Sequence, residues 1–133
     1  MHLEEPTKSA KKFHNGYFLS RAFADLCDQA AFPDNAEFVA SSYLRHLKPT
    51  RDFSRLPSTH VILAAYDMLH DEGAQYAETL KKSGVEVTVT DYPNTVHGFL
   101  SLGFTTEAYN SVSEVLKVLK GKGLVQGTNQ REV

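Results

Sequence analysis

The segment HVILAAYDMLHDEGAQYAETLKKSGVEVTVTDYPNTVHGFL, residues 60–100, changes its hydrophobic pattern twice. An apolar run, residues 60–66, predicts a strand that is buried on both faces, and the polar segment 71–83 has helical periodicity. A run of β-branched residues, 85–90, then alternates apolar and polar positions, as a strand near a sheet edge does. We therefore predict a strand–helix–strand unit whose two strands are parallel.

Two polar residues follow the two predicted strands. Asp67 comes directly after the first strand, and His97 lies shortly beyond the second, 97 − 67 = 30 residues later. The carboxyl ends of parallel strands meet at one edge of a sheet, so these side chains can contact each other. A carboxylate that accepts a hydrogen bond from Nδ1 orients the imidazole, whose Nε2 can then take a proton from a nucleophile. An aspartate at this place is also commonly a turn residue or a helix cap, and a loop histidine is commonly only solvated.

Four short motifs surround these two residues: YDMLHDEG at residues 66–73, YAETL at 76–80, SGV at 83–85 and YPNTVHGF at 92–99. In order and spacing they resemble the C-terminal part of the hormone-sensitive-lipase-like esterases, the α/β-hydrolase fold-3 group. Met68 stands where that family commonly has proline, a departure that leaves the acidic residue in place.

The resemblance implies an α/β fold: the C-terminal part of an α/β-hydrolase, with the last two parallel strands, their flanking helices and an incomplete sheet. It implies that Asp67 is the acid and His97 the base of a catalytic triad, with Gly98 and Phe99 beside the substrate pocket. The implied activity is hydrolysis of carboxylic esters, with short or medium acyl esters, or acylglycerol- or arylacetamide-like molecules, as substrates. No cofactor and no metal ion are expected.

The same resemblance also calls for a nucleophile elbow, G-x-S-x-G, and for an oxyanion-hole motif. No serine of this chain has that environment; Ser101, for example, has Gly103 two residues later but Phe99 two residues earlier. We therefore expect the isolated chain to be catalytically incomplete, as a fragment, a split gene product or a truncated gene model. The alternative is a non-catalytic remnant or a partner-binding module that complements a separate N-terminal half.

The chain divides by composition into three parts. Residues 1–12 are charged and predict a flexible arm, residues 13–120 are the part that the resemblance implies to be the hydrolase part, and residues 121–133 predict a flexible, glycine-rich tail. Within the hydrolase part, residues 13–32 predict a helix that ends before Pro33. This helix faces the core or, as the resemblance implies, lies beside the substrate pocket. Residues 36–47 predict a further short helix.

The helix over residues 71–83 is expected to be capped by Asp71 and ended by Gly84. A last helix is predicted over residues 105–120, with Thr105 or Thr106 as its cap. Its inward face is expected to contain Tyr109, Val112, Val115, Leu116 and Leu119.

The charge and the cysteine content exclude several functions. With a net charge of −2 and a pI of about 6.3, nothing in the 133 residues indicates binding to nucleic acid. No apolar run is long enough for a membrane span. The one cysteine, Cys27, cannot form an internal disulfide, and we expect it to be buried as a small hydrophobic residue in a cytoplasmic protein, unless an upstream segment carries a targeting signal.

Overall fold

The computed structural model describes residues 6–31 and 52–125, which fall into two compact units divided between His97 and Gly98. The first unit contains α1 (Lys8–Phe13), α2 (Arg21–Ala31), β1 (Thr59–Tyr66), α4 (His70–Lys82) and β2 (Val87–Val96). The second contains a short 3-10 helix, η1 (Phe99–Ser101), and α5 (Thr106–Gly121). The helix expected over residues 36–47, and the helix stop expected at Pro33, lie outside the described residues.

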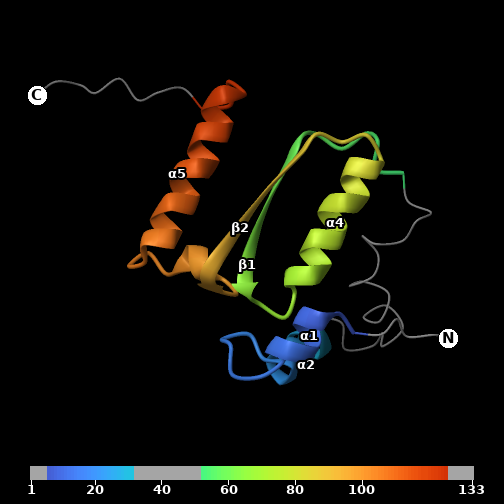
Figure 1. The fold of residues 1–133 in the computed structure, drawn as a ribbon, viewed down its shortest axis with the longest axis vertical. Coiled ribbons are helices and arrows are strands. Elements are labelled where there is room, and N and C mark those ends of the chain that lie inside the picture. The colour runs from blue at the N-terminus through green and yellow to red at the C-terminus, as the bar shows by residue number, and fades with distance from the viewer. Residues whose placement is uncertain (1–5, 32–51, 126–133) are drawn as a thin grey trace, which may run out of the picture. The chain divides into compact units, whose positions relative to one another are not determined.

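The centre of the first unit is the predicted strand–helix–strand arrangement. Strands β1 and β2 are parallel and pair with each other, and α4 connects them and packs against β1 (Figure 1). This confirms the partial α/β fold with two parallel strands and flanking helices. The expectation that β1 would be buried on both faces is wrong, since only Leu63 and Ala64 of this strand are buried. Among the described residues β1 has one neighbouring strand, so much of its length keeps contact with solvent.

Helix α4 begins one residue earlier than expected, at His70. The predicted cap by Asp71 is wrong, because Leu69 occupies the cap position and offers no side-chain acceptor. The carboxylate of Asp71 instead accepts a hydrogen bond from the backbone N–H of Ser9 in α1, at 2.9 Å. A long-range contact has therefore taken the place of the local cap.

The other end of α4 is formed as predicted. Gly84 has a φ of +84°, and its N–H donates to the carbonyl of Lys81, while the N–H of Val85 donates to the carbonyl of Leu80. This pair of bonds is the Schellman motif, which glycine adopts without the strain of a side chain. A buried cluster lies at this end of α4: Phe53, Leu80 and Val85, with Tyr76 and Val87 packed against it.

The N-terminal segment is more ordered than its charge predicts. Residues 8–12, part of the expected flexible arm, belong to α1, and Thr7 caps this helix by accepting a hydrogen bond from the N–H of Ala10 at 3.2 Å. Ser9, Ala10 and Phe13 are buried. Helix α1 therefore exposes its lysines and has a short buried face, which packs against the rest of the first unit.

Apolar side chains of α2 remain exposed in the part of the chain that the structure describes. Phe23 and Leu26 are 55% and 59% exposed. Cys27 is exposed as well, so its expected burial is wrong. The reason is that its helix is not covered on this side by any of the described residues.

In the second unit, Thr105 caps α5 as predicted, accepting a hydrogen bond from the N–H of Ala108 at 3.2 Å. The predicted inward face is wrong at Tyr109, Val112 and Leu116, which are 73%, 47% and 42% exposed, whereas Ala108 and Ser111 are buried. Helical periodicity identifies an apolar stripe, but it does not say what covers that stripe. Within residues 6–31 and 52–125, no helix has the length and apolar character that crossing a bilayer requires.

Candidate active site

Asp67 and His97 are in direct contact at the carboxyl ends of β1 and β2. Nδ1 of His97 lies 2.8 Å from Oδ2 of Asp67, so the imidazole N–H donates to the carboxylate. The Asp67 side chain is 11% exposed and the His97 side chain 41% exposed. Nε2 of His97 makes no hydrogen bond within the described residues, so this nitrogen is available to exchange a proton with a reacting group.

The register of the two strands explains how the imidazole reaches the carboxylate. Ala64 pairs with Tyr92, but Tyr66 pairs with Val96, so two residues of β1 (66 − 64) span four residues of β2 (96 − 92). The extra residues include Pro93, which has no N–H for the strand ladder and is typical of such irregularities. Because Tyr66 stands opposite Val96, the next residues on each strand, the acid and the imidazole, are level with each other.

This irregularity was not predicted from the sequence, which placed the end of the second strand at residue 90. The strand extends to Val96, and its distorted part is held by a hydrogen bond from the hydroxyl of Thr95 to the carbonyl of Tyr92, at 2.9 Å. Thr95 is buried. The backbone that presents His97 is therefore an ordered strand rather than a free loop.

Asp67 is a turn residue and the partner of His97 at the same time. Its carbonyl accepts from the N–H of His70 at 3.1 Å, and its Oδ1 accepts from the N–H of Leu69 at 2.9 Å. An aspartate that bonds the backbone two residues later is a common turn former. Here the turn fixes one carboxylate oxygen and leaves the other for His97, so the structural and the catalytic interpretations of Asp67 do not compete.

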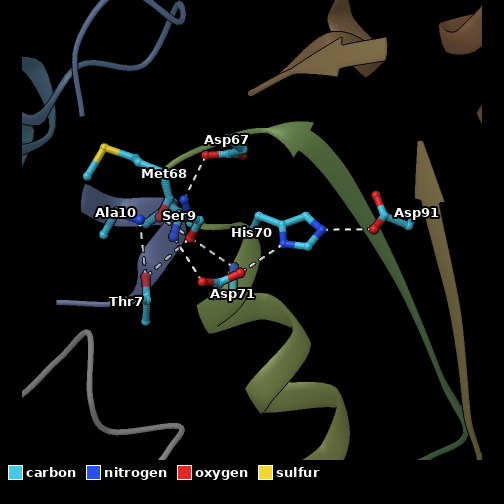
Figure 2. A network of polar contacts seen from close by, with 9 residues as sticks. Thr7, Ser9, Ala10, Asp67, Met68, His70, Asp71 and Asp91 are labelled. Carbon is cyan, nitrogen blue, oxygen red and sulfur yellow. Dashed lines mark hydrogen bonds and ion pairs between the residues drawn. The ribbon is translucent and has the colours of Figure 1, made fainter. Parts of the chain in front are cut away.

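A second histidine, which the sequence did not single out, lies between two carboxylates near this turn. Nε2 of His70 is 2.9 Å from Oδ2 of Asp91 on β2, and Nδ1 is 3.2 Å from Oδ1 of Asp71 on α4 (Figure 2). A neutral imidazole can donate through only one nitrogen, whereas the protonated ring donates through both. With both ring nitrogens engaged, His70 has no free position for a reacting group, unlike His97.

The carboxylates of Asp91 and Asp71 change the pKa of His70. Burial alone would lower the pKa of His70, but the hydrogen bonds and charges of Asp91 and Asp71 outweigh it and raise this pKa above its ordinary value of 6.5. Burial likewise opposes ionisation of Asp71, but hydrogen bonds from the Ser9 backbone and from His70 lower the pKa of that carboxyl. The two carboxylates therefore favour the protonated form of the His70 ring, and that ring in turn favours the ionised form of Asp71.

This assignment predicts a pH-dependent effect of His70→Gln on stability. Since the folded-state pKa lies above 6.5, the contribution of His70 is complete below that pH and is lost as the pH rises through the folded-state value. Urea unfolding should therefore show a larger loss of stability in the variant at about pH 5.5 than at about pH 9. In an Asp91→Asn background this pH dependence should shrink. An equal loss at both pH values would contradict the charge assignment.

The remaining predicted site residues belong to the second unit. Gly98 has a φ of +70° and precedes η1, and Phe99 is 3% exposed. Their expected place beside a substrate stays a prediction. No group of three or more His, Cys, Asp or Glu side chains within the described ranges is arranged to hold a metal ion.

Comparison with known proteins finds related hydrolases. The sequence pattern of the alpha/beta hydrolase fold family matches residues 1–101, which include the segment that forms α1. Probable carboxylesterase 16 of Arabidopsis thaliana is 28% identical over 100 residues, covering 73% of this chain and 22% of the relative. Arylacetamide deacetylase of Bos taurus is 38% identical over 64 residues, covering 48% of this chain and 16% of the relative.

Solved structures extend the similarity over more of the chain. The ester-hydrolase EH1AB1 from the metagenome of Lake Arreo superposes with a TM-score of 0.75 and 32% identity, over 92% of this chain and 38% of that protein. The esterase of Pyrobaculum calidifontis superposes with a TM-score of 0.67 and 29% identity, over 92% of this chain and 40% of that protein. The chain thus spans about a fifth of the length of the curated carboxylesterase and about two fifths of the two solved hydrolases.

Proposed function

Because this chain belongs to the alpha/beta hydrolase fold-3 family, we propose that it supplies the acid and the base of a carboxylic ester hydrolase. The observation that carries the proposal is the 2.8 Å hydrogen bond between Nδ1 of His97 and Oδ2 of Asp67. It is supported by the engaged second oxygen of Asp67 and by the free Nε2 of His97 within the described residues. His70, the other histidine between carboxylates, lacks such a free nitrogen.

The chemistry follows from these roles. A serine hydroxyl from a nucleophile elbow attacks the ester carbonyl, and Nε2 of His97 takes the hydroxyl proton. Asp67 keeps the proton of Nδ1 in place and stabilises the imidazolium that forms. The imidazolium then protonates the leaving alcohol, and water, activated by the same nitrogen, hydrolyses the acyl-enzyme. The sequence of this chain contains no such elbow, so we propose that the serine and the oxyanion hole come from another part of the enzyme.

The substrates we propose are short or medium acyl esters, or acylglycerol- or arylacetamide-like molecules. The similarity to an arylacetamide deacetylase supports the last class. Gly98 and Phe99, which directly follow the base, are proposed to line the pocket beside the acyl or alcohol group. The single cysteine favours a reducing compartment, and we propose a cytoplasmic setting on that basis.

A second candidate function is that of a non-catalytic module that binds a separate N-terminal half. The exposed apolar side chains favour it. Phe18 and Phe23 of the first unit are 73% and 55% exposed, and Phe104 and Tyr109 of the second are 86% and 73% exposed. Large apolar side chains that stay exposed are typical of surfaces that another chain covers. Both functions can hold together if the chain that covers these residues also supplies the nucleophile.

One pair of proteins tests the proposed function. The purified chain should hydrolyse p-nitrophenyl acetate and butyrate only at the background rate, because it has an imidazole but no elbow serine. A chimera in which this chain replaces the matching segment of EH1AB1 should hydrolyse both esters, because the rest of that ester-hydrolase then supplies the part of the enzyme that this chain lacks.

The controls separate misfolding from a wrong assignment. Thermal unfolding of the chimera must be cooperative before its activity is interpreted. A folded chimera without activity would contradict the proposed roles of Asp67 and His97. Turnover by the isolated chain that is abolished by His97→Ala would instead show that a nucleophile within the chain had been overlooked.

A further inference from the structure

The N-terminal segment contacts both sequence neighbours of Asp67. On one side, the ring of Phe13 packs edge-on against Tyr66 with 5.7 Å between ring centroids, and Tyr17 stacks on Tyr66 at 5.8 Å. On the other side, α1 reaches Met68, which is 4% exposed. The acidic residue is therefore held between two residues that a segment more than 45 positions earlier in the chain keeps in place.

Ser9 makes the contact on the Met68 side. Its hydroxyl donates to the carbonyl of Met68 at 3.0 Å and accepts from the N–H of Asp71 at 3.1 Å. Its backbone N–H donates to Oδ2 of Asp71 at 2.9 Å, and its hydroxyl also lies 3.2 Å from that of Thr7 (Figure 2). Ser9 is 4% exposed, so water does not readily replace these bonds.

These bonds enclose the turn that carries the acid. Met68 and Asp71 flank Leu69 and His70, whose N–H groups bond the side chain and the carbonyl of Asp67. A movement of the Met68 carbonyl therefore moves the peptide plane that leads to the Leu69 N–H. That N–H fixes Oδ1 of Asp67, and through it the direction of Oδ2 toward His97.

We propose that Ser9 is a positioning residue: its hydroxyl locks the turn after β1 so that the carboxylate of Asp67 points at Nδ1 of His97. The proposal rests on the proposed function in one respect only, the role of the Asp67 carboxylate as the acid of the triad. The bond that Ser9 controls can be measured without any hydrolysis. A residue of the segment that the sequence assigned to a flexible arm thus belongs to the support of the site.

The test uses the 133-residue chain and nuclear magnetic resonance of the His97 ring. Ring nitrogen shifts and the Nδ1 proton resonance report which nitrogen carries the proton and whether that proton is hydrogen-bonded. In Ser9→Ala we expect loss of most of the Nδ1 proton signal and a shift of the ring toward the tautomer protonated on Nε2. We also expect the Leu69 amide to exchange with solvent about tenfold faster, the effect of one lost hydrogen bond.

Two variants make this result specific. Ser9→Thr keeps the hydroxyl and should restore most of the Nδ1 signal. Ser83→Ala removes a hydroxyl of similar type, which donates to the carbonyl of Thr79 at 3.0 Å just beyond the far end of α4, and should leave His97 unchanged. If Ser9→Ala does not fold, Thr7→Ala, which removes only the cap of α1 and one contact to Ser9, should show a partial loss of the signal.

The outcomes separate this inference from the proposed function. Unchanged His97 and Leu69 signals in a folded Ser9→Ala chain would overturn the inference, and so would an equal loss in Ser83→Ala. If the unmodified chain shows no hydrogen-bonded Nδ1 proton, the Asp67–His97 pair of the proposed function fails. The role of Ser9 in locking the turn is then decided by the exchange rate of the Leu69 amide alone.

Discussion

His97→Ala in the EH1AB1 chimera is expected to lower kcat for p-nitrophenyl butyrate by on the order of 10⁶-fold, the size seen when a triad hydrolase loses its base. The reason is that no other group can take the nucleophile's proton at the right place. His70, the nearest alternative in sequence to the acid, has both ring nitrogens bonded to carboxylates. Because KM reflects substrate contacts more than proton transfer, the loss should appear mainly in kcat.

The matched control for this variant is His14→Ala. The ring of His14 is exposed, and its one hydrogen bond within residues 6–31 and 52–125 is to the carbonyl of Lys11, at 2.8 Å. Its removal should therefore leave kcat within a small factor of the parent chimera. Steady-state rates of the purified variants, with equal melting temperatures as the condition, give the comparison. A His97→Ala chimera that keeps more than about a hundredth of the parent kcat would show that another residue serves as the base.

Asp67→Asn in the same chimera should lower kcat by about 10⁴-fold, less than the loss of the base but far more than a surface change. Asparagine keeps the size of the side chain and can still accept from the Leu69 N–H through its oxygen. Its amide nitrogen would then face Nδ1 of His97, which favours the ring tautomer protonated on Nε2. That tautomer cannot take a proton from the serine.

Asp91→Asn is the control for this second prediction. Asp91 also pairs with a histidine, at 2.9 Å, but that histidine is His70, and the Asp91 side chain is 50% exposed. The Asp91→Asn substitution should therefore change the pH dependence of the free energy of unfolding rather than kcat. If Asp67→Asn lowers kcat by less than about tenfold, or if Asp91→Asn lowers it equally, the assignment of the acid is wrong.

The sequence predicted the parts of the site that depend on local pattern. A strand, a helix and a second strand follow from periodicity, and parallel strands bring the residues after them to one edge. This is why Asp67 and His97, which are 30 positions apart, could be paired from the sequence alone, and the 2.8 Å contact confirms their meeting. Gly84 and Thr105 were predicted for similar reasons, since helix ends have strong local preferences.

What the sequence did not predict depends on contacts between distant segments. Ser9 is one hydroxyl in a lysine-rich stretch, and nothing near it indicates that its partner lies 62 residues later. The charge of His70 depends on Asp91, which is brought beside it only by the strand pairing. Asp71 stands where the sequence predicts a helix cap, but its carboxylate accepts a part-buried, long-range bond from the N–H of Ser9 in α1.

The irregular part of β2, from Tyr92 to Val96, changes where the base lies along the neighbouring strand but not which face of the sheet each side chain occupies. Side chains on a strand alternate between faces with a period of two, so an insertion of two residues leaves every later side chain on its original face. The same insertion displaces the following residues along the partner strand by about 6.6 Å, two steps of about 3.3 Å. An insertion of two residues can thus move a histidine along the edge of a sheet while its strand keeps the same face toward the core, and in this chain the two extra residues of β2 place His97 level with Asp67.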